Sequence, residues 1–149
     1  MKRKKEEKQE VKKQKQREMT YTDVCIKGKY LYNALEKMFK GRFKEMKVIK
    51  AIMPLRKEVQ RIREEYVDLN TKLVEAYGKK NDRGQWEVDP ADGEDKFNDY
   101  IREADLLAKE NIEIKTKKIN LTQKQLNNAK VELDMDDRYI LEPYFNLKD

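Results

Sequence analysis

Two groups of carboxylates are the side chains in this sequence whose types and spacing could support catalysis. The first group comprises Asp92, Glu94, Asp95 and Asp99, and the second comprises Asp134, Asp136 and Asp137. Clustered carboxylates can hold two metal ions or act as acid and base in glycoside hydrolysis. Both groups lie where a helix is expected to begin, and a helix N-terminus favours negative charge. We therefore interpret them as residues that start helices.

The other residue types offer little for catalysis. The chain of 149 residues has no histidine, so the usual general base and the commonest zinc ligand are missing. Its single cysteine, Cys25, has no partner for a disulfide and is expected to pack as a small apolar side chain. Neither Gly28 nor Gly41 belongs to a phosphate-binding loop. We expect a protein without enzymatic activity, cofactor or metal.

Charge is the strongest functional signal. Residues 27–57 carry ten basic and two acidic side chains, whereas residues 58–149 have a net charge of −6. Six cations gather at the junction of the first two predicted helices: Lys37, Lys40, Arg42, Lys44, Lys47 and Lys50. They form either a solvated surface, a contact for an acidic protein, or a nonspecific site for nucleic acid. Three acids beyond them are candidate contacts for a basic groove: Glu64, Glu65 and Asp68.

One long amphipathic stretch must position these charges. Seven apolar residues follow each other at steps of four and three, which places them on one side of a helix: Leu55, Val59, Ile62, Tyr66, Leu69, Leu73 and Ala76. The run extends back to about Arg42 and contains Pro54, which either kinks a single helix or separates two. The register of Val48 and Ile52 favours a kinked continuous helix over 42–76.

Shorter elements flank this helix. Alternation predicts strands over 20–27 and around 112–114 and 119–121, and period 3.6 predicts a helix over 29–40. Turn residues after Gly78 predict a small β-hairpin, and Asp89-Pro90 predicts the start of a third helix over about 91–109. Asp134 and Asp137 frame a final helix start, followed by Tyr144 and Phe145 as a hydrophobic clasp or an exposed patch.

These elements predict a mainly α fold. Its centre is a long antiparallel helical hairpin with a shorter N-terminal helix and a minor two- or three-stranded sheet. Residues 1–19 read as a basic, disordered arm, and 20–149 as a single domain. No stretch reaches the roughly 18 uncharged residues that a membrane span requires, and no apolar segment follows the basic N-terminus. We therefore expect no membrane contact and no secretion.

The order of these segments resembles a family of short, uncharacterised proteins of tailed bacteriophages and prophages of Gram-positive bacteria. Four segments of about residues 24–145 carry the resemblance: Asn33-Ala34-Leu35, Tyr77 to Gly84, Ile112 to Leu121, and Leu141-Glu142-Pro143. The resemblance implies a phage origin, with a location in the host cytoplasm or the virion, and a helical core with a minor sheet. It implies no mechanism.

Three functions remain open. The first is a virion assembly or structural accessory protein that acts through protein–protein contacts, with homo-oligomers among them. The second is an inhibitor of a host defence nuclease, whose acidic surface would occupy a basic groove. The third is nonspecific nucleic-acid binding through residues 27–57.

Overall fold

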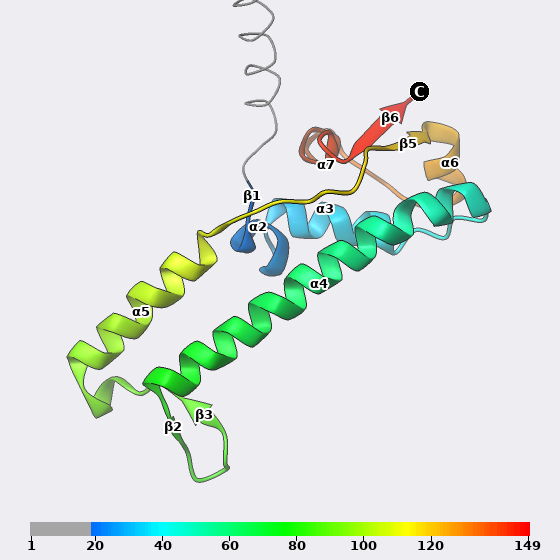
Figure 1. Cartoon of the computed structure of the whole chain (residues 1–149). Helices are drawn as coiled ribbons and strands as arrows, with labels where there is room; N and C mark the ends of the chain where they lie inside the picture. Colours follow the sequence, from blue (N-terminus) through cyan, green and yellow to red (C-terminus); the bar gives the residue numbers. More distant parts are fainter. Residues whose placement is uncertain (1–18) are drawn as a thin grey trace, which may run out of the picture.

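The computed structural model describes residues 19–149 and contains six α-helices and three separate two-stranded sheets within that range (Figure 1). The helices are α2 (Tyr21–Cys25), α3 (Tyr30–Phe39), α4 (Met46–Tyr77), α5 (Glu94–Ala108), α6 (Gln123–Asn128) and α7 (Met135–Leu141). The strands are β1 (Met19–Thr20), β2 (Lys79–Lys80), β3 (Trp86–Glu87), β4 (Asn111–Ile112), β5 (Ile119–Thr122) and β6 (Phe145–Lys148). The prediction of a mainly helical fold is confirmed. The single two- or three-stranded sheet that was predicted is instead three separate pairs of strands, with β4 and β5 in different sheets. The basic segment before Met19 lies outside the described residues.

Helix α4 is the longest element, and it is continuous through Pro54. It begins at Met46 and not near Arg42 as the periodicity predicted. The preceding segment bonds elsewhere, because the Arg42 amide donates to the Ala129 carbonyl over 3.0 Å. A side chain on Gly41 would also meet Val131, since its Cβ would lie 2.5 Å from the Val131 Cγ2. The chain is therefore held against the α6–α7 connection before it can start a helix.

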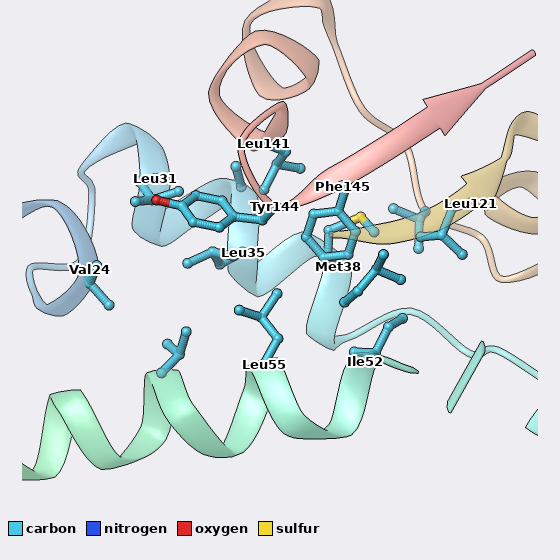
Figure 2. Packing of buried hydrophobic residues seen from close by; sticks show 14 of the residues in the cluster. Val24, Leu31, Leu35, Met38, Ile52, Leu55, Leu121, Leu141, Tyr144 and Phe145 are labelled. Atoms are coloured by element: carbon cyan, nitrogen blue, oxygen red, sulfur yellow. The ribbon is translucent and has the colours of Figure 1, made fainter. Parts of the chain in front are cut away.

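The hydrophobic core lies beside the first half of α4. Apolar side chains of α4 point toward α3, and β5, β6 and α7 add further apolar side chains to the same cluster (Figure 2). Leu55 packs near Leu35, and Ile52 lies below Phe145 and Leu121. Of the two interpretations of Tyr144 and Phe145, the clasp is correct, because both side chains are buried in this cluster.

Residues 20–27 are not a strand. The segment forms helix α2, and only Met19–Thr20 pairs as a strand, with β4. Alternation of Val24 and Ile26 suggested a strand, but the local capping signal is stronger. The Thr20 hydroxyl accepts from the Asp23 amide, and the Asp23 carboxylate accepts from the Thr20 amide, so a capping box starts a helix here.

The C-terminal third closes the core. Strand β5 pairs in parallel with β6, with Ile119 opposite Phe145 and Leu121 opposite Leu147. Alternation predicted β5, but no sequence pattern predicted β6 or helix α6. Helix α7 begins where the aspartates predicted it, because Asp134 and Asp137 form a reciprocal capping box. This part of the chain thus supplies the cover for the first half of α4.

Beyond the core, α4 leads into the β2–β3 hairpin, the short 3-10 helix η1 (Pro90–Asp92) and α5. The predicted turn is present, with the Asn81 amide donating to the Gln85 carbonyl over 2.8 Å. Asp89 caps η1 by accepting from the Ala91 amide. The third helix itself starts later than predicted, at Glu94. Rings of Tyr77 and Tyr100 lie 6.3 Å apart and link α4 to α5.

Among residues 19–149, no helix is both long and apolar enough to span a membrane.

Candidate functional site

The predicted cations gather at the end of the molecule where the chain enters α4. Lys40 ends α3, Arg42 and Lys44 lie in the connection, and Lys47 and Lys50 lie in the first turns of α4. All five are exposed, and none makes an ion pair with another described residue. The Arg42–Ala129 hydrogen bond brings the backbone of Lys130 beside them, which sequence spacing could not indicate. The five cations, which are called the basic end below, are Lys40, Arg42, Lys44, Lys47 and Lys50.

Lys37, the sixth predicted cation, serves the fold. Its Nζ lies 2.6 Å from Oδ2 of Asp137, which is the described chain's one buried charged side chain. The hydrogen bond that Lys37 donates to Asp137 raises the pKa of Lys37 and joins α3 to α7. Its charge is therefore paired with Asp137 although the Lys37 side chain stays 45% exposed, whereas the cations of the basic end have no such partner among the described residues.

The three predicted acids lie together on the middle of α4 and have different surroundings. Glu64 is exposed and accepts from Gln60, and Asp68 is exposed. Glu65 accepts a hydrogen bond of 3.1 Å from the Tyr21 hydroxyl and pairs with Arg61. Burial, and then the bond to Glu65, raise the pKa of Tyr21 to about 12. Glu65 therefore holds α2 against α4, whereas Glu64 and Asp68 point into solvent.

The part of the chain from Arg63 to Glu110 is called the distal arm. It contains fourteen acidic and eight basic side chains, a net charge of −6. Although most of it is helix or strand, none of its residues is buried. Five large apolar side chains are at least about a third exposed: Val67 60%, Leu69 36%, Trp86 42%, Ile101 49% and Leu106 59%. The second half of the predicted apolar stripe on α4 is thus poorly covered.

Arg63 anchors the distal arm to the core, and periodicity placed it on the solvated side. Its Nε donates to the Val24 carbonyl over 3.0 Å, and its Nη1 donates to Glu36 over 2.7 Å. Its guanidinium lies 4.0 Å from the centre of the Tyr32 ring. One arginine thus joins α2, α3 and α4. Its Nη2 is buried and has no hydrogen-bond partner among the described residues.

Glu58 anchors the segment between β4 and β5. Its carboxylate accepts hydrogen bonds from the Lys115 amide and from both the amide and the hydroxyl of Thr116, at 2.7–3.1 Å. Burial alone raises the pKa of Glu58, but these bonds outweigh it and the net pKa is lowered. The carboxylate therefore stays ionised and holds the return from the distal arm to the core.

Little in the described residues suits catalysis. No three His, Cys, Asp or Glu side chains between Met19 and Asp149 lie close enough to hold a metal ion. Burial raises the pKa of the Cys25 thiol to about 11, so it is a poor nucleophile. An open groove of about 530 Å³ between the start of α3 and α7 is lined by Lys29, Tyr30, Asp136 and Tyr139 among others.

Comparisons with known proteins add no relative. No protein-family model, no curated protein and no solved structure matches this chain. The interpretation of the two charged surfaces and the distal arm therefore rests on their geometry.

Proposed function

We propose that this chain is a non-enzymatic protein-interaction module in which α4 and α5 work as a helical hairpin that binds a partner protein. The observation that carries the proposal is the distal arm, in which no residue is fully buried although both of its long segments are helical. Helices of globular proteins owe most of their stability to packing of an apolar face. A 15-residue helix such as α5 is at the margin of stability by itself. A partner that covers it would supply the missing packing.

The partner's chemistry follows from the arm's composition. Exposed apolar residues such as Ile101 and Leu106 provide the burial on which protein interfaces depend. The net charge of −6 around them favours a partner whose contact surface is basic. We propose a virion component as this partner, with a basic groove of a host nuclease as the alternative. Both are protein surfaces that an acidic helical arm complements.

The test uses cross-linking of the wild-type protein in a lysate of the cells that encode it, followed by mass spectrometry. The variant Ile101→Asp/Leu106→Asp removes two exposed apolar side chains of α5, and Tyr30→Asp/Met135→Asp makes the same change at exposed positions of α3 and α7. We expect cross-links to a partner protein within residues 63–110. The amount of captured partner should fall by at least about tenfold in the arm variant and should not change in the control. Equal capture by both variants, or cross-links confined to the core, would contradict the proposal.

A second candidate is nucleic-acid binding by the basic end, favoured by the five exposed cations that have no described acidic partner. It predicts retention on DNA that falls steeply with salt. The variant Arg42→Glu/Lys44→Glu/Lys47→Glu would then lose retention, while reversal of Lys72, Lys96 and Lys109 in the distal arm would not. Equal retention of both variants would remove this candidate.

A further inference from the structure

The exposed side of α4 carries cations in its first half and acids in its second half. Its charges therefore complement those of a second α4 helix that runs in the opposite direction. Eight positions at steps of four and three form one stripe, which is called the outer stripe: Lys50, Pro54, Lys57, Arg61, Glu64, Asp68, Thr71 and Glu75. All eight residues are exposed. Its first half holds three cations and its second half three acids. A helix turned end for end about a point between Ile62 and Arg63 would place each cation opposite an acid.

We infer that a second copy of this chain binds along the outer stripe, with the two α4 helices antiparallel about a two-fold axis. Lys50 would face Glu75, Lys57 would face Asp68, and Arg61 would face Glu64, with each pair formed twice by symmetry. The uncharged positions Pro54 and Thr71 would also meet. The stripe covers 26 residues, a contact length of roughly 38 Å at ~1.5 Å per residue.

The rest of the fold leaves this stripe accessible. It lies on the opposite side of α4 from the buried residues Leu55, Val59 and Ile62. Tyr77, which contacts Tyr100 of α5, continues the buried side, so α5 also lies away from the outer stripe. Two copies could therefore pair through α4 with their cores and their α5 helices directed outward.

The charges of the stripe are mostly unneutralised within one copy. Lys50, Lys57, Asp68 and Glu75 form no ion pair with any residue of 19–149. Arg61 pairs with Glu65 along the same helix at 3.3 Å, and both side chains stay about half exposed. Apolar area next to the stripe comes from Met46 and Met53, which are 62% and 46% exposed. Exposed ion pairs are weak singly, so the charges fix the register and direction while these methionines add burial.

Self-association can be separated from the proposed function, because it needs only the purified chain and a different side of α4. The test is light scattering and sedimentation of the full chain in low and high salt. One variant, Lys50→Glu/Lys57→Glu, makes the stripe largely acidic, and another, Asp68→Lys/Glu75→Lys, makes it largely basic. The control Lys96→Glu/Lys124→Glu reverses two exposed cations outside the stripe.

We expect a wild-type dimer that weakens in high salt, and variants that are each monomeric, with dimerisation weakened by at least about tenfold. Mixing the two variants should restore a dimer that contains one copy of each, since every reversed charge then meets its opposite. The control should dimerise like the wild type. A monomeric wild type, or two variants that fail to pair when mixed although each is folded by circular dichroism, would overturn the inference.

Discussion

Single polar side chains, more than the apolar stripe, decide how the helices of this protein meet. Arg63 joins α2, α3 and α4, Glu58 holds the segment that returns from α5, and the Lys37–Asp137 pair joins α3 to α7. Each of these residues appears in the sequence as one more charge on an amphipathic helix. Their partners are 27 to 100 residues away in the sequence, so no local pattern identifies them.

Removal of the Arg63 side chain should destabilise the core. The variant Arg63→Ala loses two hydrogen bonds to the guanidinium and leaves Glu36 without its partner in a half-buried position. We expect a loss of about 2–3 kcal/mol in the free energy of unfolding, measured with urea. Arg61→Ala, in the same helix but exposed, should cost less than about 0.5 kcal/mol. Equal losses in both variants would contradict the role given to Arg63.

Glu58 should make stability depend on pH in the acid range. Its pKa in the folded protein is lowered from the ordinary value of 4.5. Its contribution is therefore present above pH 4.5 and is lost as the pH falls through the folded pKa. We expect Glu58→Gln to cost about 2 kcal/mol at neutral pH, and the wild-type and variant stabilities to converge in acid. A difference that stays constant from neutral pH into acid would show that the ionised carboxylate is not the stabilising form.

At the scale of elements, long periodic segments could be predicted and short capped ones could not. Helices α3 and α4 and the start of α7 follow from periodicity and from their first residues. Helices α2 and α6 are only five and six residues long, too short for a period to be distinguished from alternation. Their signal was the capping box, Thr20 with Asp23 and Thr122 with Gln125, which outweighs two alternating apolar residues.

The candidate site follows the same rule. The basic end and the acidic middle of α4 could be found from charge runs alone, because neighbours along one helix and its entry stay neighbours in space. Charge runs could not show that Lys37 pairs with Asp137, because this ion pair depends on how α7 packs against α3. The exposure of the distal arm could not be predicted either. Periodicity shows that a helix has an apolar side, but it does not show whether another element covers that side.

Pro54 lies inside α4, where a proline is expected to cost stability. A proline inside a helix lacks the amide that would bond to the carbonyl four residues earlier, yet α4 continues through it. The variant Pro54→Ala should stabilise the protein by about 2 kcal/mol, because alanine is about 3 kcal/mol more favourable in a helix interior and the more flexible unfolded chain offsets about 1. Thermal unfolding measures the change. A lower melting temperature would mean that the packing around α4 requires proline at this position.

At the scale of the whole molecule, the protein divides into a packed half and an uncovered half. The buried side chains come from residues 19–62 and 119–145, whereas residues 63–118 contribute none. Single residues such as Arg63 and Glu58 join the halves without burying the arm. We propose that the first half is the scaffold and that the second half offers the surface for a partner, with the outer stripe of α4 as the place for a second copy.

Hydrogen exchange of the purified full chain, followed by mass spectrometry, tests this division most directly. Local stability follows the packing of each segment, so amides of β2, β3 and α5, residues 79–109, should exchange through local opening at least about a hundredfold faster than those of α3, β5 and α7. The first half of α4 should be as protected as the core. Equal protection of residues 79–109 and of the core would mean that the arm is an integral part of the fold, and would contradict the division into a packed half and an uncovered half.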